Sequence, residues 1–94
     1  MPYIAAAHRP RYDERVSALA DTIDDSTPGG EMNYIVTSVL VAWLEKRGLD
    51  YAALAEAVGV LETAKLELYR RVAAPYEDGK IAENGDVYGD LASV

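Results

Sequence analysis

The chain of 94 residues contains no cysteine and no phenylalanine, and it has one tryptophan, one histidine and four prolines. Without cysteine, no disulfide framework can hold the fold, and no thiol can act as a nucleophile. The single histidine, His8, has no second histidine or cysteine at ligand spacing, so we predict no metal site. No glycine-rich phosphate loop is present, and we predict no cofactor. The lack of cysteine favours a reducing, cytoplasmic setting.

Long apolar runs are also missing. The most apolar stretch, residues 34–44, is interrupted by Thr37 and Ser38 and is about half as long as a membrane-spanning helix must be. Residues 1–9 lack a positively charged region before a long apolar core, so they do not resemble a secretory signal. We therefore predict no membrane partner.

The charge balance is acidic, with 16 acidic against 9 basic residues and a net charge of −7. A chain with this charge repels a phosphate backbone, which excludes general nucleic-acid binding. A local basic cluster could still hold a small anion, because salt confines the wider field to about 8–10 Å. Half of the residues are apolar, which predicts one globular domain over residues 1–94.

Apolar periodicity predicts an all-α fold with three main helices, packed as a small bundle or a helical hairpin. The expected helices cover about residues 9–24, 28–47 and 50–74. Gly48 follows the second helix in the position that favours glycine. Asp50 is a typical cap for the third helix.

Two predictions remain open for the segment after Pro75. Acidic residues in a first turn and Gly85 as a terminator indicate a short helix. The pair Asn84 and Gly85, between alternating residues, indicates a β-hairpin instead. We favour the short helix, and we expect residues 89–94 to form a frayed tail.

The second helix is apolar on most of its circumference, with only a few polar residues between positions 32 and 45. Such a helix must be covered on several sides, and two further helices in one small chain cannot do this. We therefore predict a homo-oligomer. Its predicted interface consists of Tyr34, Ile35, Val39 and Trp43 from the second helix and Leu54, Leu61 and Leu68 from the third.

The third helix carries a seam of alternating three- and four-residue steps, which is typical of closely packed helices. This seam consists of Tyr51, Leu54, Val58, Leu61, Leu68 and Val72, with Lys65 at the one position where an apolar residue is missing. One interpretation lays the stem of Lys65 along the seam, with its ammonium reaching water or a carboxylate. In the other, Lys65 is a buried cation that binds an anionic ligand. We favour the first.

Further cationic and aromatic side chains follow Lys65. Arginine suits bidentate phosphate binding, and tyrosine suits stacking on a base. If neighbouring chains of an oligomer contribute these side chains together, the side chains could bind a small anionic ligand that bears phosphate. The candidate residues are Lys65, Tyr69, Arg70, Arg71 and Tyr76. The favoured alternative is surface pairing of Glu67 with Arg71 and of Glu62 with Lys65. No motif identifies a catalytic residue, and an enzyme using Glu62 and Lys65 is the weakest hypothesis.

Residues 67–78 read ELYRRVAAPYED, residues 83–88 read ENGDVY, and the chain opens MPYI with MNY at positions 32–34. In these segments the chain resembles a family of short uncharacterised proteins from bacteria and their phages. The resemblance implies no activity or ligand, but it implies a viral or prophage setting, where small helical oligomers often sequester a target. The leading hypothesis is a non-enzymatic oligomeric interaction protein that binds such a phosphate-bearing ligand. The alternative is an adaptor or inhibitor that binds a protein target through its acidic surface.

Overall fold

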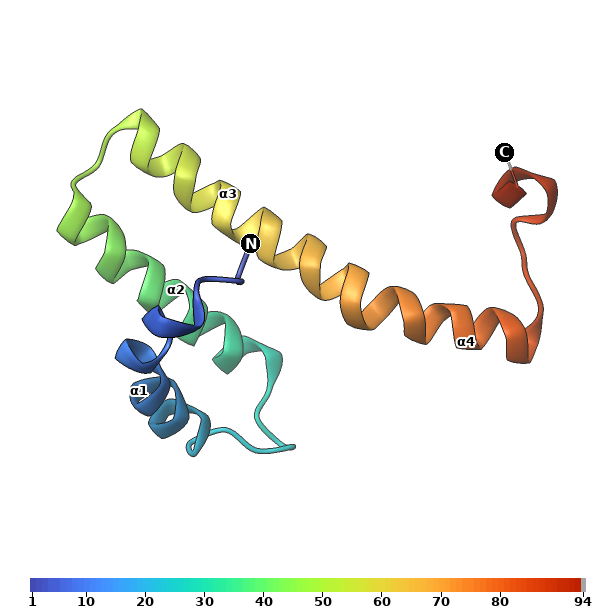
Figure 1. Ribbon diagram of the computed structural model, residues 1–94, viewed down its shortest axis with the longest axis horizontal. Helices are drawn as coiled ribbons and strands as arrows, with labels where there is room; N and C mark the ends of the chain where they lie inside the picture. Colours follow the sequence, from blue (N-terminus) through green and yellow to red (C-terminus); the bar gives the residue numbers. More distant parts are fainter. Residues whose placement is uncertain (94) are drawn as a thin grey trace. The chain divides into compact units, whose positions relative to one another are not determined.

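The computed structural model describes residues 1–93, and every regular element within that range is helical (Figure 1). The α-helices are α1 (Pro10–Ala20), α2 (Gly29–Arg47), α3 (Tyr51–Leu68) and α4 (Ala74–Asn84). Shorter elements are the 3-10 helices η1 (Ala6–His8) and η3 (Gly89–Ser93) and the π-helical turn η2 (Tyr69–Ala73). The prediction of an all-α fold with three main helices is confirmed.

The chain divides into two compact units, the first comprising Met1–Val60 and the second beginning at Leu61. The first unit holds η1, α1, α2 and the beginning of α3, and the second holds the rest of the helical path. That residues 1–94 form one domain stays a prediction. Fraying of residues 89–94 also stays a prediction, since Gly89–Ser93 is a 3-10 helix and position 94 lies outside the described residues.

Helix α1 ends at Ala20, whereas the sequence pattern predicted an end near Asp24. The side chain of Asp24 accepts hydrogen bonds from the Ser26 amide (2.9 Å) and the Ser26 hydroxyl (2.7 Å), and the Asp24 amide donates to the Thr27 hydroxyl (3.0 Å). Short polar side chains offer the backbone these alternatives to helical bonds, which explains the earlier end. The bond from the Ser26 hydroxyl is the main reason why the pKa of Asp24 is lowered.

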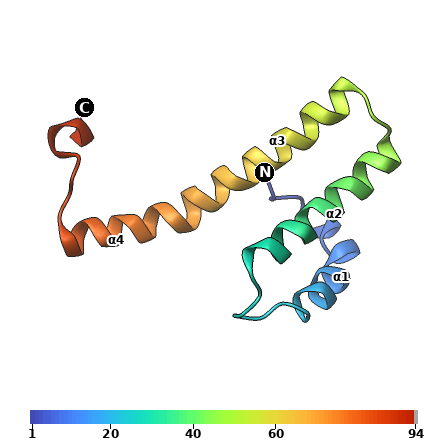
Figure 2. The same ribbon diagram turned by 180° about the vertical axis from the view of Figure 1, so that it is seen from behind.

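Helices α2 and α3 are joined by a tight connection that forms a helical hairpin (Figure 2). Gly48 has a positive φ of 91°, which favours glycine, and its amide donates to the Leu44 carbonyl at 2.9 Å. The Asp50 carboxylate then accepts a hydrogen bond of 2.7 Å from the Ala53 amide at the start of α3. Both predicted helix ends are therefore confirmed.

Few residues are buried. Ala53 and Ala57, one helical turn apart on α3, are 1% and 6% exposed, and they are the only buried residues between positions 1 and 92. An ion pair between Arg47 of α2 and Glu56 of α3 spans the hairpin. Within that range, the buried core thus consists of two alanines.

Pro75 does not end the helical path, although the helix predicted over residues 50–74 ends directly before it. The preceding residues form the π-helical turn η2, in which the Ala74 amide donates to the Tyr69 carbonyl, five residues back. Proline lacks an amide proton, and its ring clashes with the carbonyl four residues before it. The wider turn accommodates this ring, and α4 continues directly.

Helix α4 ends as the short-helix prediction requires, and the hairpin alternative is wrong. Gly85 has a φ of 92°, and its amide donates to the Ile81 carbonyl at 2.8 Å. After the helix, the Tyr88 amide donates to the Asp86 carboxylate at 2.8 Å. The residues that suggested a hairpin turn therefore form a helix end, because a glycine with positive φ serves both structures.

Candidate functional site

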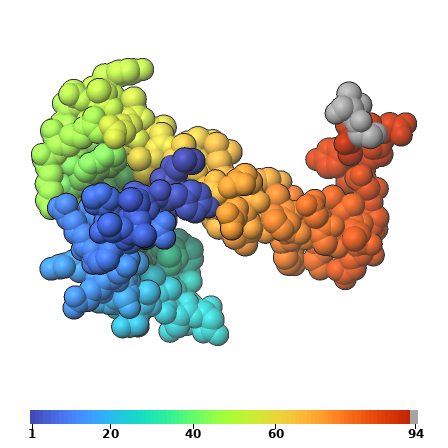
Figure 3. All heavy atoms as spheres, in the orientation of Figure 1, coloured from blue at the N-terminus to red at the C-terminus, as the bar shows by residue number. Residues whose placement is uncertain are grey.

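The apolar face of α2 is open to solvent. No residue of α2 is buried, and Tyr34 and Val39 are 73% and 61% exposed. In the view of Figure 3, the atoms of α1 (blue) lie in front of part of α2 (green). Of the predicted interface residues on this helix, Ile35 and Trp43 are half-buried. The helix is therefore only partly covered within the first unit.

The seam along α3 is exposed as well. All six apolar members and Lys65 are exposed, including the predicted interface residues Leu54, Leu61 and Leu68. The buried alanines Ala53 and Ala57 lie beside the seam and not on it. Helix α3 thus buries two small side chains and leaves the larger apolar side chains of its seam exposed.

The predicted ligand residues are mostly occupied by partners on the same helical path. The ammonium of Lys65 lies 3.0 Å from the Glu62 carboxylate, with 67% and 54% of the two side chains exposed. Arg70 binds Glu67 through two nitrogens, at 2.6 and 3.3 Å. Lys65 therefore has the predicted surface partner, whereas Glu67 pairs with Arg70 and not with Arg71.

The position of Arg70 on the helix explains why Glu67 pairs with it and not with Arg71. Glu67 has only 17% of its side chain exposed, and Arg70, three residues further along the helix, reaches both of its carboxylate oxygens. Residues three or four apart on a helix are neighbours, so both arginines were candidates from spacing alone. Arg71 makes no ion pair with any of the residues that the structure describes.

Two tyrosines have partners on α4. The Tyr69 hydroxyl donates a 2.8 Å hydrogen bond to the Glu77 carboxylate. This bond, followed by the negative charge of Glu77, raises the pKa of Tyr69. Tyr76 has the Lys80 ammonium 5.5 Å from its ring centre. Tyr69 and Tyr76 thus each have a partner on the same helical path.

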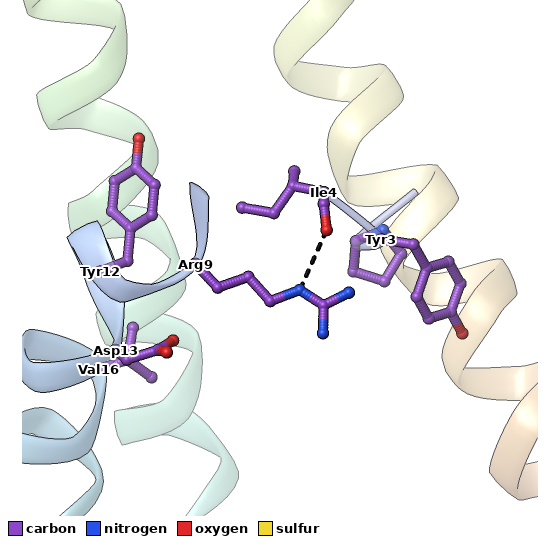
Figure 4. A pocket seen from close by; sticks show the side chains of 7 residues that line it. Tyr3, Ile4, Arg9, Tyr12, Asp13 and Val16 are labelled. Atoms are coloured by element: carbon purple, nitrogen blue, oxygen red, sulfur yellow. Dashed lines mark hydrogen bonds between the residues drawn. The ribbon is translucent and has the colours of Figure 1, made fainter. Parts of the chain in front are cut away.

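An open groove in the first unit was not predicted from the sequence. It has a volume of about 560 Å³ and is lined by Pro2, Tyr3, Ile4, Arg9, Tyr12, Asp13 and Val16. Across it the Arg9 Nε donates to the Ile4 carbonyl at 3.0 Å (Figure 4). The only available signal was the apolar opening of the chain next to the amphipathic pattern of α1. A second hollow of about 480 Å³ lies at the end of α2, against Leu44 and Leu49.

Within residues 1–93, no three His, Cys, Asp or Glu side chains gather closely enough to hold a metal ion. Among the helices of the same range, none combines the length and the hydropathy that crossing a membrane requires.

Comparison with known proteins places the chain in a family but assigns it no activity. The comparison with curated proteins found no match, and neither did the comparison with solved structures. The profile of one protein family matches residues 1–87, which is nearly the whole chain. The chain therefore belongs to the family described as Domain of unknown function (DUF6899).

Proposed function

We propose that this protein is a non-enzymatic interaction protein that works as a homo-oligomer, assembled through α2 and the α3 seam. The observation that carries the proposal is the exposure of the apolar side chains on both helices, with only Ala53 and Ala57 buried. Soluble monomers rarely expose apolar patches larger than a few hundred Å². A second copy would cover these faces with the same kind of surface.

A phosphate-bearing small molecule is the ligand that we propose for the assembled protein. It would bind to Lys65, Tyr69, Arg70, Arg71 and Tyr76 contributed by neighbouring chains. Arg71 supports this, because its guanidinium makes no ion pair within residues 1–93. Lys65 could exchange Glu62 for a phosphate at small cost, since an exposed pair at this spacing contributes only about 0.2–0.5 kcal/mol. Sequestering such a ligand suits the phage or prophage setting that the sequence resemblance implies.

Multi-angle light scattering at micromolar concentration tests the assembly. We expect a mass of at least two chains and a melting temperature that rises with protein concentration, because association stabilises the folded state by mass action. A monomer whose melting temperature does not depend on concentration would contradict the proposal.

A thermal-shift screen of nucleotides and cyclic nucleotides tests the ligand separately. A compound at 100 times its dissociation constant should stabilise the protein by about 2.7 kcal/mol. Arg71→Gln should remove that shift while the oligomer remains, and Arg11→Gln on α1 is the matched control. A flat screen with an intact oligomer would contradict the ligand and leave the assembly in place.

A further inference from the structure

The α3 seam contains two alternating positions. Tyr51, Val58, Lys65 and Val72 occupy the first, which we call a, and Leu54, Leu61 and Leu68 occupy the second, which we call d. Lys65 is the one charged member of the seam. In paired helices, a single lysine at an a position lowers stability but selects the alignment of the two helices. Lys65 therefore restricts how a second α3 can lie against the first.

The geometry at Lys65 shows which partner it can accept. Its ammonium already pairs with Glu62 at 3.0 Å, and both side chains are more than half exposed. Glu62 directly follows Leu61, so its carboxylate flanks the seam on the side that Lys65 also reaches. The Lys65 ammonium and the Glu62 carboxylate can therefore both contact a second copy of the chain without breaking any buried contact.

We propose that two copies pair antiparallel along α3, with Lys65 of each copy beside Leu61 of the other and its ammonium against that copy's Glu62. This inference rests on the proposed oligomer and defines its contact. In the assembled pair, two lysines and two glutamates alternate in sign around the symmetry axis. Each charge then has an opposite charge on its own chain and another across the contact.

Other antiparallel alignments leave Lys65 without a carboxylate from the second copy. In antiparallel pairs of this kind, an a residue lies opposite a d residue of the other helix. Lys65 could therefore lie opposite Leu54, Leu61 or Leu68. Leu54 is followed by Ala55 and Leu68 by Tyr69, whereas Leu61 is followed by Glu62. The alignment with Leu61 is the one that offers Lys65 a charge partner.

A parallel pair is disfavoured by the same residue. Parallel helices bring equal positions together, so Lys65 would face Lys65 of the second copy, and like charges at contact distance repel. The antiparallel alignment instead places Ala64 opposite Ala64 on the flank of the seam. A methyl group on each side allows the helices to approach closely. Charge and side-chain size thus favour the same orientation.

The charges are tested by mixing two variants. Lys65→Glu makes the charge cluster wholly acidic, and Glu62→Lys makes it wholly basic, so we expect each variant alone to dissociate about tenfold more readily than the wild type. An equimolar mixture should assemble as tightly as the wild type, because each contact then joins opposite charges. If the two charges interact only within their own chain, mixing restores nothing, and the inference is overturned.

The matched control is Lys80→Glu. Lys80 pairs with Glu83 at the same three-residue spacing, at 3.4 Å, on α4 and away from the seam. This variant should associate like the wild type. An equal loss of association in Lys80→Glu would mean that total charge and not the seam decides assembly, which contradicts the inference.

The orientation is tested by cross-linking, for which a chain without cysteine is well suited. Val58→Cys and Leu68→Cys should be joined to each other by a short bismaleimide when mixed, because 58 lies opposite 68 in the proposed alignment. Preferential joining of each variant to itself would indicate a parallel pair and overturn the inference. An oligomer that shows neither link would overturn it as well, whereas a monomeric wild type would contradict the proposed function itself.

Discussion

The two units of the chain are stabilised in different ways. In the first unit, Ala53 and Ala57 are buried, one ion pair joins α2 to α3, and large apolar side chains remain exposed. In the second unit, the side chains from Leu61 onward pair with neighbours a few residues away: Glu62 with Lys65, Glu67 with Arg70, Tyr69 with Glu77, and Lys80 with Glu83. The comparison teaches that polar pairs can be completed along one helix, whereas apolar faces need another surface.

The largest effect should come from placing a charge on the apolar face of α2. We expect Val39→Asp to dissociate the oligomer and to lower stability by about 2–4 kcal/mol, because a buried unpaired carboxylate is costly. Light scattering and thermal unfolding measure both effects. Val87→Asp, at a residue that is 91% exposed after α4, is the control. If Val39→Asp behaves like this control, the face of α2 is not covered in solution.

A smaller effect should follow from enlarging a buried alanine. Ala53 is 1% exposed, and Ala53→Leu should destabilise the protein by about 1–3 kcal/mol, because extra methylene groups at a buried position force the surrounding atoms apart. Ala52→Leu changes the adjacent exposed residue and should have little effect. Chemical denaturation compares the two variants. Equal stability would show that position 53 has room for a larger side chain.

Removing the cap of α3 should cost less. Asp50→Ala eliminates the acceptor for the Ala53 amide, and we expect a loss of about 1 kcal/mol. Asp50→Asn, which keeps an acceptor oxygen, should retain most of the stability. Thermal unfolding monitored by circular dichroism distinguishes the two variants, and identical curves would rule out a capping role.

The smallest effect concerns Tyr69 in the second unit. Its pKa is raised above 10.0 by the bond to Glu77, so the stabilising contribution is present below pH 10 and disappears as the pH rises through the raised pKa. We expect the ionisation of Tyr69, followed by NMR, to occur above pH 10, and Tyr69→Phe to remove this step. Glu77→Gln should move the ionisation of Tyr69 back toward pH 10. An unchanged titration of Tyr69 in Glu77→Gln would exclude Glu77 as the cause.

Local patterns predicted most of the helical segments. The steps of the seam predicted α3, and Gly48 and Asp50 marked its boundary with α2, because caps and periodicity depend on residues close in sequence. The same kind of reasoning failed at Pro75. A π-turn accommodates the proline through a backbone adjustment that leaves no distinct signal in residue types. Spacing also could not decide between Arg70 and Arg71 as the partner of Glu67, since both lie at helical contact distance.

The sequence by itself determined that this chain is helical and acidic and that its second helix is apolar on most of its circumference. These properties follow from composition and periodicity, which no folding can change. Only the tertiary structure decided which apolar side chains stay exposed, because the burial of Ala53 and Ala57 depends on how the first unit packs. It likewise decided that Lys65 lies on an open seam beside Glu62, where a second copy can reach both charges.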